Sequence, residues 1–194
     1  KDLCFEIIQT CPNKCKFCSS NSSKDKKTII TLEDFKKTVM YFITHGGIGE
    51  ISISGGEPFL HPDLFEIIKY CKDNGIRTVI FTSGIKRTSV IPIEIIEYIK
   101  NKCNQDLQEI EEHESWNERL KENVKTYYQR MLNPGEFTSL TRQELEKIKR
   151  LGVDKIVFDW QALDESIDNE LMGRKSLNTY LIDSLIRASS VGLN

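Results

Sequence analysis

The sequence predicts an α/β fold in which a parallel sheet curls toward a partial barrel. Apolar, β-rich segments alternate with segments whose apolar residues recur at helical spacing, and glycine-containing turns separate the two kinds of segment. This alternation favours parallel strands joined by right-handed crossovers. Each predicted strand also runs into a polar motif, at the strand end where parallel α/β proteins place their functional sites.

The first half of the chain contains three predicted strands and three predicted helices. The strands are expected at residues 3–9, 50–54 and 76–82. Thr31 is expected to cap the first helix, with Asp34 three residues later. The second helix is expected to open with Pro62 at its first helical position, and Pro92 to start a third helix that runs to about Asn101.

Residues 104–136 interrupt the alternation and are predicted to be a charged helical insertion. Its apolar residues recur at helical spacing: Trp116, Leu120, Val124, Tyr127, Tyr128 and Met131. A helix packed on the outside of the barrel is the first interpretation, and a partner-binding helix is the alternative. After the insertion, Thr141 and Glu144 form a capping box, followed by a fourth strand at 154–161 and a helix at 176–190.

Composition limits the classes of protein. The 194 residues are 39% hydrophobic and 29% charged with a net charge of −2, which suits one globular domain and gives no argument for binding nucleic acid or an anionic membrane. No apolar stretch is long enough to span a bilayer. Three of the six cysteines share one loop, which indicates metal binding in a reducing compartment, so a cytoplasmic location is expected.

The cysteine loop directly follows the first predicted strand. Cys11, Cys15 and Cys18 stand in the run C-P-N-K-C-K-F-C. Three thiolates on one loop suit an iron–sulfur cluster or a soft metal, and a set one ligand short of four leaves a position open. A structural zinc site is the alternative, but zinc usually takes two pairs of ligands, whereas Cys71 and Cys103 are isolated.

A second motif, G-G-E-P, follows the second predicted strand. Gly55 and Gly56 would let backbone carbonyl groups approach a bound molecule closely, and Glu57 would add a carboxylate acceptor. An acidic glycine turn is common in α/β proteins. The motif gains weight because it lies one strand after the cysteine loop.

Together the two motifs resemble those of the radical S-adenosylmethionine (SAM) enzymes. Their signature is this cysteine spacing with an aromatic residue before the last cysteine, here Phe17. The resemblance implies that Cys11, Cys15 and Cys18 bind a [4Fe-4S] cluster and that SAM chelates the open iron through its amino and carboxylate groups. It also implies that Glu57, with the two glycines, meets the SAM ammonium and that Phe17 shapes the adenine pocket.

The resemblance continues along the chain. Thr82-Ser83-Gly84 matches the family's T-N-G, with Ser83 in place of asparagine. From Val157, V-F-D-W-Q-A-L-D is similar to a stretch of the molybdopterin-type and peptide-modifying (SPASM-like) subgroup, which implies that Asp159 and Gln161 reach the SAM ribose. Residues two apart on a strand share a face, and ordinary polar strand ends are the alternative. Met172 stands where the family has arginine and is assigned no role.

The implied function is that of a radical SAM enzyme. Reductive cleavage of SAM would yield a 5′-deoxyadenosyl radical that abstracts hydrogen from a peptide or small-molecule substrate, with flavodoxin or ferredoxin as the electron donor. A non-catalytic iron–sulfur or zinc-binding module is the alternative. The family's core has six strand–helix units and about four are expected here. Residues 1–194 are therefore expected to be an incomplete core that a C-terminal part or a partner chain completes.

Overall fold

The computed structural model describes residues 1–87, 93–112, 118–132, 135–175 and 177–193. They divide into two compact units. The core unit comprises Lys1–Lys86 and Phe137–Asn194, and the helical unit comprises Arg87–Glu136. Pro92 and Trp116, which were expected to lie in helices, fall outside the described residues.

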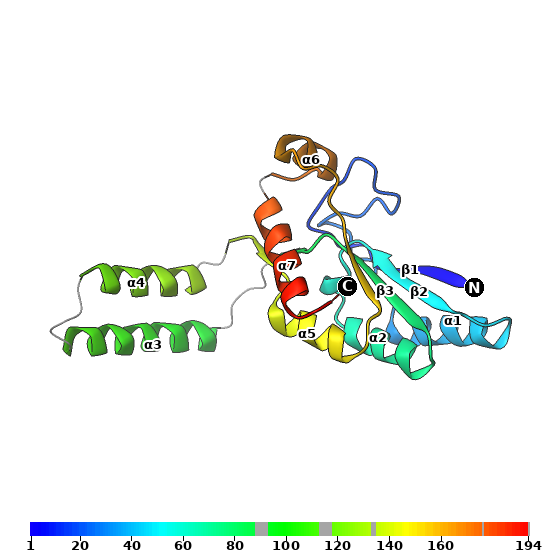
Figure 1. Cartoon of the computed structure of the whole chain (residues 1–194), viewed down its shortest axis with the longest axis horizontal. Helices are drawn as coiled ribbons and strands as arrows, with labels where there is room; N and C mark the ends of the chain where they lie inside the picture. Colours follow the sequence, from blue (N-terminus) through cyan, green and yellow to red (C-terminus); the bar gives the residue numbers. More distant parts are fainter. Residues whose placement is uncertain (88–92, 113–117, 133–134, 176, 194) are drawn as a thin grey trace. The chain divides into compact units, whose positions relative to one another are not determined.

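Four parallel strands form the central sheet of the core unit in the order β1-β2-β3-β6 (Figure 1). They are β1 (Asp2–Ile8), β2 (Glu50–Gly55), β3 (Arg77–Thr82) and β6 (Lys155–Phe158). Neighbouring strands are in register with Phe5 opposite Ile53 and Ile53 opposite Ile80. The parallel α/β prediction is confirmed, and the described strands form an open sheet rather than a closed barrel.

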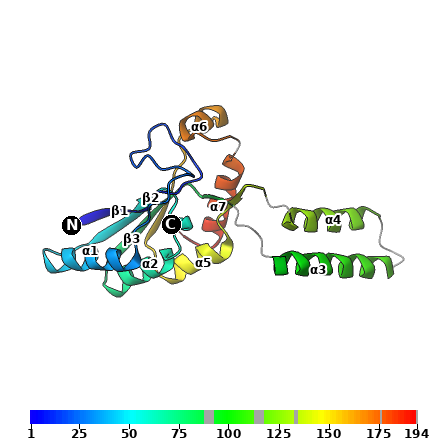
Figure 2. The ribbon, with the colours of Figure 1, turned by 180° about the vertical axis from the view of Figure 1, so that it is seen from behind.

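Helices cover one face of this sheet (Figures 1 and 2). The helices that contribute to the core are α1 (Leu32–Thr44), α2 (Leu64–Asp73), α5 (Arg142–Arg150) and α7 (Asn178–Ser190). Ile51 and Ile53 of β2 are fully buried against them, as period-two alternation requires. The side chains that alternate with buried residues along β2 and β3 are partly or largely exposed, as at Ser52, Ser54 and Phe81. The other face of the sheet is therefore less covered among the described residues.

Two helix starts agree with the sequence prediction. The Thr31 hydroxyl accepts a hydrogen bond from the Asp34 amide at 3.1 Å, which caps α1. Thr141 and Glu144 form the predicted capping box of α5, with the side chain of each accepting from the backbone of the other. Both caps satisfy amide groups that a helix start leaves without partners.

The predicted start of α2 at Pro62 is wrong. The helix begins at Leu64, because the Asp63 amide donates to His61 Nδ1 at 3.0 Å and holds a non-helical turn there. A proline does stand at a helix start nearby, in the short 3-10 helix η1 (Pro58–Leu60).

Three short elements, which lie wholly or mostly in the core unit, were not predicted. They are β4 (Ile85–Arg87), β5 (Phe137–Ser139) and α6 (Glu165–Met172). β4 and β5 pair as a two-stranded sheet and are too short to show a hydrophobic period. The predicted fourth strand was too long, since β6 ends at Phe158 and the chain then turns toward Asp164, which caps α6.

The described part of the helical unit contains two helices that contact each other. They are α3 (Ile93–Glu112) and α4 (Glu118–Leu132). The predicted helix end at Asn101 is wrong, because α3 continues and buries Ile99 and Ile110, while α4 buries Tyr128. The compact unit therefore begins before the expected insertion at 104–136. No helix among the described residues is both long and apolar enough to cross a membrane.

Candidate functional site

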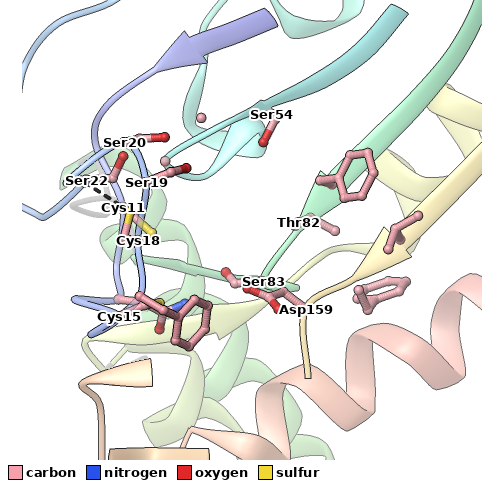
Figure 3. Close-up of a pocket in the computed structure, with 17 residues that line it drawn as sticks. Cys11, Cys15, Cys18, Ser19, Ser20, Ser22, Ser54, Thr82, Ser83 and Asp159 are labelled. Atoms are coloured by element: carbon pink, nitrogen blue, oxygen red, sulfur yellow. Dashed lines mark hydrogen bonds between the residues drawn. The ribbon is translucent and has the colours of Figure 1, made fainter. Parts of the chain in front are cut away.

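A cavity of about 360 Å³ opens at the carboxyl ends of the central strands (Figure 3). The cysteine loop forms one wall, and the ends of β2, β3 and β6 form the others. The sequence-predicted site residues that line it are Cys11, Cys15, Phe17, Cys18, Gly55, Gly56, Ser83 and Asp159. Glu57 and Gln161 do not line it. Four loops that are distant in the sequence thus meet at one place.

The three thiols of the cysteine loop are free and influence one another. Burial raises the pKa of the Cys11 thiol well above its usual value, and the charges of Glu57, Cys15 and Cys18 raise it further. Burial also raises the pKa of Cys15 to about 11. Cys18 Sγ accepts a hydrogen bond from the Ser22 amide at 3.3 Å. Three thiolates here would repel one another, so a cationic group bound among them would relieve the repulsion.

The three free thiols form a sulfur donor set of the kind that holds an iron–sulfur cluster. Among the described residues, no three or more His, Cys, Asp or Glu side chains converge on a point that could hold one ion. A zinc ion needs its sulfur ligands at about 2.3 Å from one centre. The thiolates that hold an iron–sulfur cluster bind different iron atoms, so they need not converge in this way.

The glycine loop packs directly against the end of β1. A Cβ atom on Gly56 would lie 2.2 Å from the Thr10 carbonyl oxygen, and one on Gly55 would lie 2.4 Å from the Ile8 oxygen. Gly55 also has a φ of +120°, which side chains rarely tolerate. The Gly56 amide donates to the Ile8 oxygen at 2.5 Å. The glycines are therefore needed for contact with the start of the cysteine loop, a reason that the sequence did not reveal.

Glu57 is fully buried and its carboxylate is fully engaged. One oxygen accepts from the Thr82 hydroxyl at 2.7 Å and the Phe59 amide at 3.2 Å. The other accepts from the Ser83 amide at 2.9 Å and the Ser83 hydroxyl at 2.6 Å. Burial raises the pKa of Glu57, and these hydrogen bonds oppose the rise. In this structure Glu57 holds the end of β3 and the loop that follows it, and both Thr82 of the strand and Ser83 of the loop line the cavity.

On the β6 side, the side-chain amide of Gln161 donates to the Asp159 carboxylate. Burial raises the pKa of Asp159, while Gln161 and the positive charge of Arg174 lower it. Phe17 is 50% exposed and lines the cavity, as does Phe81 of β3. The cavity therefore combines thiols and a carboxylate with apolar rings, which suits a ligand that is both polar and aromatic.

Sequence reasoning missed a buried ion pair beside the site. Arg174 donates to Asp168 at 2.6 Å, and both side chains are at most 1% exposed. The Arg174 charge also lowers the pKa of Cys15, against the larger effect of burial. The sequence offers one signal for it, the pair Gly173-Arg174 that follows a helical run.

The sequence model of the Radical SAM superfamily matches residues 5–110, more than half of the chain. The chain therefore belongs to the radical SAM superfamily. The matched region begins in β1, includes the cysteine and glycine loops, and ends in α3.

Curated relatives share parts of this region. The PqqA peptide cyclase of Bradyrhizobium diazoefficiens is 33% identical over 85 residues, which cover 43% of this chain and 22% of that protein. A probable GTP 3′,8-cyclase of Methanococcus vannielii is 27% identical over 155 residues, which cover 79% of this chain and 44% of that protein. The chain thus spans less than half the length of these relatives.

Solved structures support the fold. Streptococcus suis SuiB bound to S-adenosylmethionine superposes on the whole chain with a TM-score of 0.54 at 18% identity, over 32% of SuiB. Methylornithine synthase (PylB) superposes on 99% of the chain with a TM-score of 0.57 at 13% identity, over 42% of that protein. At these identities the likeness shows the fold alone.

Proposed function

We propose that this chain provides the cluster- and SAM-binding part of a radical SAM enzyme that acts on a peptide or small molecule. The observation that carries the proposal is the meeting of the cysteine loop with the ends of β2, β3 and β6 around one cavity. When bound, a [4Fe-4S] cluster and SAM supply reductive SAM cleavage and hydrogen-atom abstraction, while the protein supplies binding, orientation and exclusion of water.

Cys11, Cys15 and Cys18 are the proposed cluster ligands. They line one side of the cavity. Burial raises the pKa values of the Cys11 and Cys15 thiols, so both stay protonated at neutral pH until a cation replaces their protons. Among the described residues, no fourth cysteine lines the cavity, and a set of three ligands would leave one iron open for SAM.

The glycine loop and the loop after β3 are the proposed binding region for the methionine part of SAM. Gly55 and Gly56 expose backbone at the cavity wall next to the cysteine loop. Glu57 acts through Ser83, whose amide and hydroxyl it holds. A direct contact between Glu57 and the SAM ammonium would require one carboxylate oxygen to exchange a partner.

The β6 end and the apolar wall are the proposed binding region for the nucleoside part. Asp159 faces the cavity with Gln161 hydrogen-bonded to it, an arrangement able to accept hydrogen bonds from ribose hydroxyls. Phe17 and Phe81 offer aromatic surface to the adenine.

The relatives suggest two classes of substrate. Peptide substrates are suggested by the peptide cyclase among the curated relatives and by the solved complex of SuiB with its precursor peptide SuiA. Small molecules are suggested by the GTP cyclase. A one-electron donor such as flavodoxin or ferredoxin is proposed to reduce the cluster.

Anaerobic reconstitution with iron and sulfide tests the proposal. The native chain should take up about four iron atoms, and its electron paramagnetic resonance (EPR) spectrum after reduction should change when SAM is added. Cys15→Ala should lose the cluster, whereas Cys4→Ala, which removes an exposed thiol outside the cavity, should keep it. Deuterium transfer from labelled candidate substrates into 5′-deoxyadenosine would then identify the substrate.

Two results would contradict the proposal. Full iron content in the Cys15→Ala protein would remove the ligand assignment. A stable cluster whose spectrum does not respond to SAM would indicate a non-catalytic iron–sulfur module instead.

A further inference from the structure

The carboxyl end of α6 is hydrogen-bonded to the cysteine loop on both sides of Cys15. The Lys14 amide donates to the Met172 oxygen at 3.2 Å, and the Lys16 amide donates to the Leu171 oxygen at 2.9 Å. Cys15 Sγ lies 3.7 Å from the Met172 sulfur. The last carbonyl groups of a helix have no partner within the helix, so the loop completes the end of α6 and α6 holds the loop.

Gly173 makes this contact possible. It caps α6 with a φ of +60°, and a Cβ atom there would lie 2.0 Å from the Lys14 oxygen and 2.7 Å from the Lys14 carbonyl carbon. Both obstacles are backbone atoms, so neither a side-chain rotation nor a small shift would relieve the clash.

The Asp168–Arg174 ion pair fixes α6 from inside the protein. Asp168 accepts from Arg174 at 2.6 Å through one oxygen and from the backbone amide of Gln161 at 3.0 Å through the other. Arg174 also donates to the Asn178 side chain at 3.0 Å. The pair therefore joins α6 to the chain that leaves β6 and to the first residue of α7.

A gain in folding stability does not by itself account for the Asp168–Arg174 ion pair. Its two charges are buried, and Nε and Nη1 of Arg174 have no hydrogen-bond partner among the described residues. Desolvation of such a pair commonly offsets its attraction, so its presence points to a role in fixing a position. The position that it fixes is that of the α6 end, which contacts the loop around Cys15.

We propose that Arg174 is a positioning residue, which together with Asp168 locks the end of α6 against the cysteine loop and so fixes the place of Cys15 before any cluster binds. The inference rests on the proposed function in one respect, which is that the cysteine loop holds a cluster. The contacts themselves are measurable in the metal-free chain.

Amide hydrogen exchange of the metal-free, reduced chain tests the proposal. Arg174→Gln and Asp168→Asn should speed the exchange of the Lys14 and Lys16 amides at least tenfold and leave the amides of β2 and β3 unchanged. Arg174→Lys, which keeps the charge, should recover part of the protection. Glu170→Gln is the matched control, because it removes only the exposed ion pair between α6 and Lys16.

A second measurement reports on Cys15 directly. Alkylation of Cys15, followed by mass spectrometry, should be several-fold faster in Asp168→Asn than in Glu170→Gln, because the loop leaves α6 more often while the charge of Arg174 near Cys15 is kept. In reconstituted protein, the same variant should broaden or shift the EPR spectrum of the reduced cluster.

The proposal is overturned if exchange at Lys14 and Lys16 stays at the native rate, or if β2 and β3 loosen as much as the loop. If Arg174→Gln does not fold, the same exchange measurement on the double variant Asp168→Leu, Arg174→Met tests the proposal instead. The double variant removes both charges at once, and retained protection of the loop in it would refute the proposal. A failure to bind SAM would refute the proposed function and leave these results unaffected.

Discussion

Gly56→Ala should separate the glycine loop from the cysteine loop. The new Cβ atom would lie 2.2 Å from the Thr10 oxygen and 2.9 Å from the Gln9 carbonyl carbon, both of which belong to the backbone. Ordinary carbon–oxygen contact is roughly 3.4 Å or longer, so one of the two loops must move by roughly 1 Å. The substitution needs no unusual φ, and the effect is therefore purely one of space.

The cost follows from the contacts that this movement breaks. The amide of Gly56 donates to Ile8 and the amide of Glu57 donates to Thr10 at 2.9 Å. Weakening both hydrogen bonds should cost about 1 kcal/mol each, and the overpacking should cost about 1–3 kcal/mol. The free energy of unfolding should thus fall by about 3–5 kcal/mol, a large part of the stability of a typical domain.

Urea unfolding of the metal-free chain, followed by circular dichroism, measures this change. Gly49→Ala is the control, since its Cβ would meet nothing closer than 3.7 Å and should change the stability by less than about 0.5 kcal/mol. Iron uptake after reconstitution should fall in Gly56→Ala and stay normal in Gly49→Ala. A Gly56→Ala protein as stable as the control would refute the reasoning from backbone contact.

Glu57→Gln should lower the free energy of unfolding by about 2 kcal/mol and weaken SAM binding in a titration, with near-normal iron content, because it disturbs the buried hydrogen bonds to the loop after β3. Ser184→Ala should cost about 1–2 kcal/mol in urea unfolding, since its buried hydroxyl bridges a carbonyl of one loop and an amide of another. Asp154→Asn should cost about 1 kcal/mol at pH 7, because Asp154 accepts from Lys72 and from the Thr78 amide. Partial burial raises the pKa of Asp154, but these partners outweigh it and the net pKa is lowered. Asp154 therefore contributes to the free energy of unfolding above the ordinary aspartate pKa, and this contribution is lost as the pH falls through the lowered pKa. The difference in unfolding free energy between the native chain and Asp154→Asn should shrink as the pH falls below about 4. A difference that grew at low pH would contradict this prediction.

The sequence predicted what depends on neighbouring residues. The caps at Thr31 and Thr141 could be predicted because each lies within four residues of its partner. The strands could be predicted from runs of β-branched residues. The loops of the site could be predicted because parallel strands end at one edge of a sheet.

What escaped prediction depends on contacts between distant parts of the chain. Besides the nearby Phe59 amide, the partners of Glu57 are Thr82 and Ser83, which lie 25 and 26 residues away, and no local pattern shows that its carboxylate is already engaged by them. Cys15 meets Met172 across 157 residues, so α6 could not be connected with the cysteine loop by spacing. The end of α3 was missed for a local reason, because asparagine is a weak stop signal when the apolar spacing continues beyond it.

The pairing of β4 with β5 has a consequence for how this protein can change over generations. The chain leaves the core unit at the end of β4 and returns at the start of β5. Paired strands lie about 4.8 Å apart, so a segment inserted there begins and ends at nearly the same point. Doubling the length of such a segment costs only about 0.6 kcal/mol in closure entropy. Descendants of one ancestral core could therefore gain, lengthen or discard residues 88–136 without altering the register of the sheet that carries the cysteines.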